Sequence, residues 1–217
     1  RVPPIPRTAI RLSSAEDTAK IITAEGGIAL PLVADVTRED AAAAAVALAV
    51  GELGVPTILH NNVGVAVTGG IGDLTRTDWD RALALNVTGV FLACKYTVPH
   101  MLAARRGAII NVSSLASVRY VGYDYPAYMA AKAAVNQLTV SLALTHARDG
   151  IRVNAVLPGL IDTPLVGQQL HTDGELDAAR ARRDQASPTG RMGSPWDVAN
   201  AAVFLASDEG SFVTGQT

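Results

Sequence analysis

Residues 107–114 read Gly-Ala-Ile-Ile-Asn-Val-Ser-Ser, an apolar run that stops at two hydroxyl side chains. A short apolar run bounded by turn residues predicts a strand buried on both faces. A helical stretch follows it to about Arg148, and a second apolar run occupies residues 151–156. Strand, helix and strand in this order predict a parallel sheet covered by helices.

The same alternation extends in both directions along the chain. Further strands are predicted at 28–33 and 57–60, and helices over about 13–26, 37–53 and 79–101. Another helix should begin at Ser194, since proline follows at the first helical position and Asp197 at the third. No repeat or low-complexity linker divides the chain. We therefore predict one domain over residues 1–217, built on a parallel sheet that helices cover on both faces.

Composition indicates a large core and excludes several kinds of partner. The 217 residues are 49% hydrophobic and 18% charged, and the net charge of −2 favours neither nucleic acid nor an anionic membrane. The longest apolar run, at 41–50, is too short to span a bilayer, and no secretory signal is evident, so we expect a soluble, cytoplasmic protein. The single cysteine, Cys94, excludes an internal disulfide and is predicted to be a buried structural thiol.

Polar or turn residues follow every predicted strand. Asp35 follows the first, Asn61 to Gly64 the second, Ser113 and Ser114 the third, and Pro158-Gly159 the fourth. Each could be an ordinary turn. Because ligands of open α/β sheets bind beyond the carboxyl ends of the strands, their joint placement predicts a site at this edge.

Tyr128 and Lys132 lie four residues apart in a predicted helix, so the phenol and the ammonium share one helix face. At about 4 Å and an effective dielectric near 20, their attraction is on the order of 4 kcal/mol. Lowering a tyrosine pKa by two to three units needs roughly 3–4 kcal/mol. The spacing therefore predicts that Lys132 brings the pKa of Tyr128 towards neutrality. A surface tyrosine and lysine that merely share a helix side remain the alternative.

Taken together, these motifs resemble the short-chain dehydrogenase/reductase family. The matching segments are Ala34-Asp35-Val36, Asn61-Asn62-Val63-Gly64, Leu85-Asn86-Val87-Thr88-Gly89, Ile110 to Ser114, Tyr128 with Lys132, and Asn154 with Pro158-Gly159 and Thr163. The resemblance implies an α/β fold with a Rossmann-like, doubly wound parallel sheet in three α/β/α layers. It further implies an NAD(P)-dependent oxidoreductase that interconverts an alcohol and a carbonyl compound. It also implies a small-molecule substrate, no metal site, and assembly as a homodimer or homotetramer.

The resemblance implies four catalytic residues. Tyr128 would be the general acid/base, and Lys132 would lower its pKa and bind the nicotinamide ribose. Ser114, rather than Ser113, would orient the carbonyl group. Asn86 would be the helix-kinking asparagine whose backbone holds a water near the lysine.

The resemblance also implies a cofactor site, formed by Tyr128, Lys132 and residues from three turns. Asp35 and Val36 would flank the adenine, and the turn Asn61, Val63 and Gly64 would lie behind the adenosine. The nicotinamide carboxamide would be held by Pro158, Gly159, Ile161 and Thr163. NAD and NADP both remain open; Arg7 and Arg11, near the end of the expected second strand, favour NADP.

Residues 164–192 are predicted to form a substrate lid within the domain, hinged at Gly167, Gly174 and Gly190 and carrying a solvated His171. His60, His100 and His146 have no partners for a metal site or a catalytic triad. An apolar stripe in the Tyr128 helix, formed by Val135, Leu138, Leu142 and Leu144, fits either subunit association or the core.

The chain departs from the family pattern at both ends. No T-G-x-x-x-G-x-G turn occurs, the first strand is missing with it, and the sequence stops where the family continues into a last strand. We expect the sequence to be incomplete at both ends. The departure leaves open a non-catalytic scaffold or binding protein without the dinucleotide phosphate loop, and, less favoured, an epimerase or dehydratase.

Overall fold

The structure, a computed structural model, describes residues 15–163 and 176–217. Its centre is a parallel sheet in the order β1-β2-β3, with β1 at Ile58–Asn61, β2 at Gly107–Val112 and β3 at Ile151–Val156. Ile58 pairs with Ala108, and Ile110 pairs with Asn154. The parallel sheet predicted from the apolar runs is therefore confirmed for these three strands.

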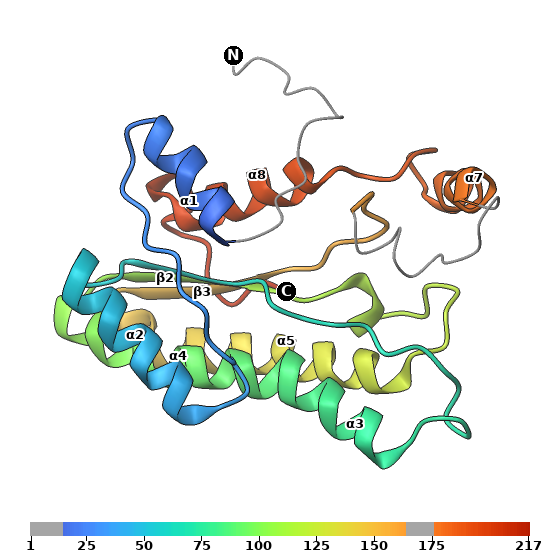
Figure 1. Ribbon diagram of the computed structural model, residues 1–217, viewed down its shortest axis with the longest axis horizontal. Helices are drawn as coiled ribbons and strands as arrows, with labels where there is room; N and C mark the ends of the chain where they lie inside the picture. Colours follow the sequence, from blue (N-terminus) through green and yellow to red (C-terminus); the bar gives the residue numbers. More distant parts are fainter. Residues whose placement is uncertain (1–14, 164–175) are drawn as a thin grey trace.

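Helices cover both faces of the sheet (Figure 1). On one side lie α2 (Glu39–Leu53), α4 (Gly89–Ala104) and α5 (Pro126–His146); on the other lie α1 (Ala15–Ala24) and α8 (Pro195–Ala206). The remaining α-helices of the described segments are α3 (Arg76–Leu83) and α7 (Leu176–Ala186). The three-layer arrangement agrees with the sequence prediction. The predicted cap of α8 is present, because the Asp197 carboxylate accepts hydrogen bonds from the Ser194 backbone N–H and hydroxyl.

The central strand β2 packs against a different helical layer on each face. Ile109 joins a buried cluster that includes Met101 of α4 and Val135 of α5. Ala108 and Ile110 point the other way and pack with Ala202 of α8. This alternation is the two-residue period of a strand, and burial on both faces explains why the sequence reads as a continuous apolar run.

A helix spanning Arg76–Ala104 is long and apolar enough to cross a bilayer by length and composition alone. Core helices of water-soluble proteins meet the same criteria, and 44% of its most apolar window is buried inside this fold. Its side chains Val90, Cys94, Val98 and Met101 belong to the core cluster around Ile109. Cys94 is a buried free thiol, and desolvation raises its pKa to about 11, so the prediction of a structural thiol is confirmed.

The predicted strand at 28–33 is wrong. These residues adopt no regular structure, and the side chains of Ile28 and Val33 are 86% and 100% exposed. A strand is stabilised by ladder hydrogen bonds to a neighbour, and the described residues contain no strand on the open side of β1 that could pair with this segment. An apolar run alone could not reveal that the neighbour is missing.

The C-terminal residues lie alongside β3. Gly215 donates its backbone N–H to Val153 O at 2.8 Å, and Ala155 donates to Gln216 O at 2.8 Å. The Asn154 side chain, 1% exposed, adds bonds to Val213 O and from the Gln216 N–H. The chain thus continues the sheet edge after Val213 in the direction expected for a following strand.

The apolar stripe of α5 divides between core and surface. Val135 is fully buried, and Leu138 and Leu142 pack against the same core cluster. Leu144 is 76% exposed, and Phe91 on the adjacent α4 is 47% exposed. The core therefore accounts for three of the four stripe residues.

A buried polar chain links two strands to α5. The Asn61 side-chain amide donates to Asn111 Oδ1 at 2.8 Å, and the Asn111 amide donates to Thr139 Oγ1 at 2.8 Å. Thr139 in turn donates to Val135 O. Because Asn111 and Thr139 are completely buried, these two side chains depend on their neighbours in the chain for hydrogen bonding.

Replacing Thr139 with valine is expected to destabilise the fold by about 1–3 kcal/mol, because the isosteric side chain leaves the buried Asn111 amide without its acceptor. Urea unfolding followed by circular dichroism measures the change. Thr145→Val is the matched control, since Thr145 makes the same type of bond, to Ser141 O, on an exposed part of α5. Equal effects at both positions would contradict a structural role for the buried chain.

Candidate active site

Helix α5 brings Tyr128 and Lys132 to the carboxyl end of β2. Lys132 is 3% exposed, and its Nζ donates a hydrogen bond to Val112 O at 2.8 Å. The same Nζ lies 5.8 Å from the centre of the half-buried Tyr128 ring. The shared helix face predicted from the four-residue spacing is therefore present, and it points to the strand end that carries Ser113 and Ser114.

The electrostatics of this pair differ from the sequence prediction. Burial raises the pKa of Tyr128, with an opposing contribution from the Ser114 hydroxyl, whereas we expected a lowered pKa. Lys132 is itself desolvated, and burial lowers its pKa from 10.5 to about 8. Spacing along a helix determines only which helix face a side chain is on. Here the Lys132 ammonium turns towards the Val112 carbonyl, and burial removes water from both the phenol and the ammonium, which disfavours their charged forms.

The two serines after β2 have separate roles. The Ser113 hydroxyl is buried and donates to Lys132 O at 3.1 Å, so it ties the strand end to α5. The half-buried Ser114 caps a short 3₁₀ helix, Leu115–Ser117, and its hydroxyl interacts with the phenol of Tyr128. Of the two serines, Ser114 is therefore the one whose hydroxyl lies beside Tyr128.

Asn86 lies in a π-helical turn, Ala84–Thr88, that joins α3 to α4. Its completely buried amide donates to Val65 O and Ala82 O, both at 2.9 Å, and accepts from the Val65 N–H at 3.2 Å. A π-turn marks the predicted irregularity in the helix and is a common feature of functional sites. Here the turn lets one asparagine fix the backbone that follows β1.

Gly64 packs directly on this asparagine and on the lysine. A Cβ added at Gly64 would lie 2.7 Å from Asn86 Oδ1 and 3.1 Å from Lys132 Nζ. We expect Gly64→Ala to destabilise the fold by about 1–3 kcal/mol, because a methyl group overfills the contact. Thermal unfolding measures this effect, and Gly72→Ala, which meets nothing within 4 Å, is the control. An unchanged melting temperature for Gly64→Ala would contradict the packing.

The other predicted cofactor residues are placed as follows. The exposed Asp35 carboxylate accepts from the Thr37 N–H and hydroxyl, which lowers its pKa, so it caps the turn before α2. Val36 packs against Gly89 of α4. The Asn61 amide bonds to Asn111 and is therefore committed to the buried polar chain. Val63 is 55% exposed beyond the end of β1.

The segment after β3 returns towards the serines. Pro158 O accepts the Leu115 N–H at 3.0 Å, which joins this turn to the segment after β2. Gly159 is exposed, and Ile161 forms a bridge with Gly193. Thr163 ends this described segment. The predicted carboxamide site thus lies beside the Ser114 turn, although Ile161 also packs within the fold.

The first part of the predicted lid, residues 164–175 with Gly167, His171 and Gly174, lies outside the described residues, and α7 follows it within the predicted range. The sequence analysis missed three residues near Tyr128. Tyr125 contacts the Tyr128 ring edge-on, Tyr123 stacks on Tyr125, and Arg183 of α7 contacts Tyr123. The sequence did contain one sign of this aromatic cluster, because four of the chain's five tyrosines lie within residues 120–128.

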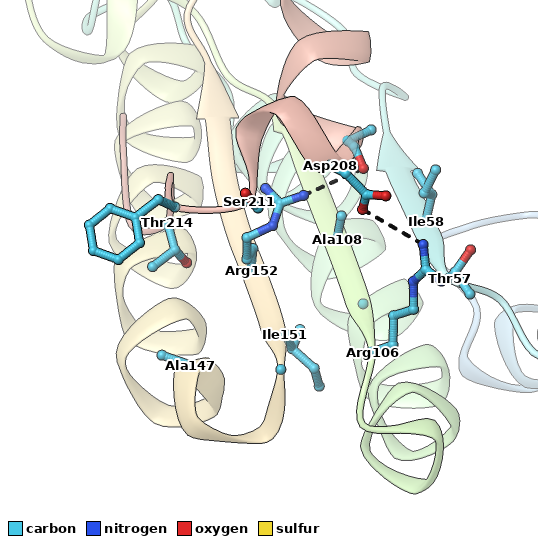
Figure 2. A pocket seen from close by; sticks show the side chains of 14 residues that line it. Thr57, Ile58, Arg106, Ala108, Ala147, Ile151, Arg152, Asp208, Ser211 and Thr214 are labelled. Carbon is cyan, nitrogen blue, oxygen red and sulfur yellow. Dashed lines mark hydrogen bonds and ion pairs between the residues drawn. The ribbon is translucent and has the colours of Figure 1, made fainter.

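A pocket of about 600 Å³ lies elsewhere, at the amino ends of the strands. Figure 2 shows Arg106 and Arg152 beside Asp208 in this pocket, together with Thr57 and Ile151 at the strand starts. Arg152 donates to Leu205 O at 2.6 Å and to Ser207 O at 3.1 Å, and so caps the end of α8. Because Tyr128 and Lys132 lie at the carboxyl ends, this pocket is separate from the candidate active site.

The chain is similar to known oxidoreductases over most of its length. The family profile described as enoyl-(acyl carrier protein) reductase matches residues 8–217. The chain is 41% identical to 2-(S)-hydroxypropyl-CoM dehydrogenase 3 of Xanthobacter autotrophicus, covering 93% of this chain and 78% of that protein. It is 45% identical to the inactive 2-(S)-hydroxypropyl-CoM dehydrogenase 2 of the same organism, covering 88% and 82%.

Among solved structures, a gluconate 5-dehydrogenase from Burkholderia cenocepacia in complex with NADP and tartrate superposes with a TM-score of 0.83. It is 32% identical and covers 93% of this chain and 77% of that one. A Rossmann-like sheet with a serine, tyrosine and lysine at one strand end defines a class of nicotinamide-dependent oxidoreductases. The chain belongs to the short-chain dehydrogenase/reductase family.

Proposed function

We propose that this protein is an NAD(P)-dependent oxidoreductase that interconverts a small alcohol and its carbonyl compound. The observation that carries the proposal is the convergence of Ser114, Tyr128 and the buried Lys132 at the end of β2. Burial of an ammonium without a carboxylate partner costs stability, so a lysine in this position is consistent with a functional role. The named activities of the relatives, which are dehydrogenases of hydroxy compounds, support the same class of reaction.

In this proposal Tyr128 donates a proton to the carbonyl oxygen during reduction and accepts it during oxidation. Because burial raises its pKa, the phenol is protonated at neutral pH and is ready to act as an acid. The Ser114 hydroxyl, which interacts with the phenol, orients the substrate oxygen. A dinucleotide bound at this site would supply the hydride for reduction, or accept it in oxidation, at its nicotinamide ring.

Lys132 is suited to hold the ribose of the dinucleotide. An ammonium has three N–H donors, and within the described residues Val112 O is the one hydrogen-bond acceptor that Nζ reaches. Two donors therefore remain for ribose hydroxyls, so the residues fit the nicotinamide end of the cofactor. In the proposal Asn86 keeps Gly64 and Val65 against this lysine and, through its backbone, holds a water of the proton relay.

We assign the remaining cofactor contacts to three turns at the same sheet edge: Asp35 and Val36; Asn61, Val63 and Gly64; and Pro158, Gly159, Ile161 and Thr163. The Asn61 side chain contributes through its bond to Asn111, so its role is to fix the turn. This assignment is compatible with either NAD or NADP as the cofactor. Arg7 and Arg11, which favour NADP, lie outside the described residues. We further propose a cytoplasmic location and a homodimer or homotetramer.

The second candidate is a non-catalytic member of the family. It is favoured by the relative of 45% identity that is named as inactive. The combination of Asn86, Ser114, Tyr128 and Lys132 argues for catalysis, since a scaffold has no chemical use for this set.

A spectrophotometric assay of the protein with NADH and NADPH at 340 nm, against a panel of ketones, and with the oxidised cofactors against alcohols, tests the proposal. We expect turnover with at least one substrate pair. Cofactor binding without turnover across the panel would favour the non-catalytic candidate. Failure to bind either dinucleotide would contradict the proposal outright.

A further inference from the structure

A series of aromatic contacts leads from Tyr128 away from the sheet. The Tyr125 ring meets the Tyr128 ring edge-on, with centres 5.5 Å apart and an angle of 82°. The Tyr123 ring stacks on Tyr125 at 5.8 Å and 11°. Both arrangements are ones that aromatic pairs prefer, so the position of each ring restrains the next.

Arg183 of α7 forms the far end of this series. Its Nη1 donates to the Tyr123 hydroxyl at 3.0 Å, and its guanidinium carbon lies 5.5 Å from the centre of the Tyr123 ring. A hydrogen bond and a cation–π contact to the same side chain are more restrictive than either alone. Arg183 is half-buried, which limits competition from water.

The other polar contacts of α7 go to different parts of the chain. Arg180 approaches Asp162 at 3.4 Å on the surface, and the Asp184 carboxylate accepts the Met192 N–H at 2.6 Å. Among the polar contacts of the described residues, Arg183 is the residue that joins α7 to the segment leading into α5. The helix is thus coupled to the tyrosine through two intervening rings.

We propose that Arg183 is a positioning residue, which fixes the ring of Tyr128 through Tyr123 and Tyr125. The inference rests on the proposed function, because it assigns Tyr128 the proton transfer. A general acid must lie within hydrogen-bonding reach of the substrate oxygen, and small misplacements reduce the rate strongly. Arg183 itself touches neither the phenol hydroxyl nor Lys132 in this arrangement, so it acts only through the rings.

The kinetic test compares Arg183→Met with Arg182→Met, an exposed arginine on the same helix. We expect kcat of Arg183→Met to fall about tenfold with KM nearly unchanged, because proton transfer and not binding is impaired. Tyr123→Phe keeps the ring but removes the acceptor, and should lower kcat by about two- to fivefold. A rise in KM with unchanged kcat, or equal effects in Arg182→Met, would overturn the proposal.

Hydrogen–deuterium exchange gives a readout that does not require activity. Arg183→Met should increase exchange in residues 119–128 and 176–186 while exchange in β2 stays at the wild-type level; Tyr123→Phe should do so more weakly. Unchanged exchange in 119–128 would refute the coupling even if the wild-type protein shows no turnover. If coupling is present and turnover is absent, the proposed function fails and the contact remains established. Thermal unfolding of each variant verifies that it is folded.

Discussion

Replacing Lys132 with methionine is expected to remove most of the activity and, at pH 7, to make the protein more stable. The ammonium is 3% exposed, and burial lowers its pKa to about 8. The difference from the ordinary value of 10.5 corresponds to about 3 kcal/mol of desolvation at about 1.4 kcal/mol per pKa unit. Methionine has a similar length without a charge. Since the bond to Val112 O is also lost, a net gain of about 1–3 kcal/mol is expected.

The gain should depend on pH in a defined direction. Between pH 8 and pH 10.5 the unfolded chain keeps a proton on Lys132 that the folded chain has lost. Unfolding therefore takes up a proton, and the stability of the wild-type protein rises with pH across this window. Below about pH 8 Lys132 is charged in both the folded and the unfolded chain, so the full desolvation cost of the ammonium is present. The advantage of Lys132→Met should thus be largest at or below pH 7 and smallest near pH 10.

Urea unfolding of the wild type and Lys132→Met at pH 7 and pH 10 measures this pattern, and turnover should fall about 10²- to 10³-fold. Lys95→Met is the control, because Lys95 forms an exposed ion pair with Glu39 on α2. That variant should be neutral or slightly destabilised and fully active. If Lys132→Met were less stable than wild type at pH 7, the ammonium would be stabilising where we infer that it is costly.

Tyr128→Phe is expected to lower turnover by about 10²- to 10⁴-fold, the usual contribution of a general acid/base. Phenylalanine keeps the ring and its edge-on contact with Tyr125, so folding and the positions of Ser114 and Lys132 should be preserved. Dinucleotide affinity should change little, because the proposed ribose donor, Lys132, is retained. The loss should therefore appear in kcat and not in cofactor binding.

Two measurements on the same preparation separate the effect on kcat from the effect on cofactor binding. A discontinuous assay measures turnover, and a fluorescence titration measures the affinity for NADPH. Tyr120→Phe is the matched control, since this nearby tyrosine is 65% exposed and bonds only weakly, at 3.4 Å, to Asp124. Wild-type turnover in Tyr128→Phe would show that another group transfers the proton. The account of the active site would then be wrong even if the reaction class were right.

The sequence predicted helices and strands best where the spacing of apolar residues agreed with the residues that mark the ends of these elements. The strands β2 and β3 and the helix α2 were predicted within a few residues, because burial on both faces and capping residues mark their limits. The single helix predicted at 79–101 is divided in the structure into α3, a π-helical turn and α4. The run at 28–33 is also apolar, but the described part of the chain provides no strand beside it. A strand forms only where a neighbouring strand can pair with it, and amino-acid composition does not reveal whether such a neighbour exists.

Within the site, the placement of residues at the strand ends was predictable and their electrostatics were not. The irregular helix expected at Asn86 is present as a π-helical turn, and Ser114 lies beside Tyr128 while Ser113 bonds to Lys132 O. The direction of the Tyr128 pKa was wrong because the Lys132 ammonium points at the Val112 carbonyl and both groups are desolvated. Side-chain direction and burial arise from tertiary packing, which a four-residue spacing does not contain.

The contacts of Arg183 and of Thr139 illustrate what remained hidden. Arg183 is 60 residues from Tyr123, and Thr139 is 28 residues from Asn111. Neither belongs to a motif, and a polar residue on a helix gives no sign of its partner. The tyrosine cluster at 120–128 was visible, but its coupling to α7 requires the fold.

Hydride transfer is the central claim, and isotope transfer tests it most directly. The protein is incubated with a ketone that it turns over and with NADPH or NADH deuterated at C4, on either face of the ring. Mass spectrometry of the alcohol product should find one deuterium on the carbinol carbon from one of the two labelled faces. An alcohol without deuterium from both labelled cofactors would contradict the account.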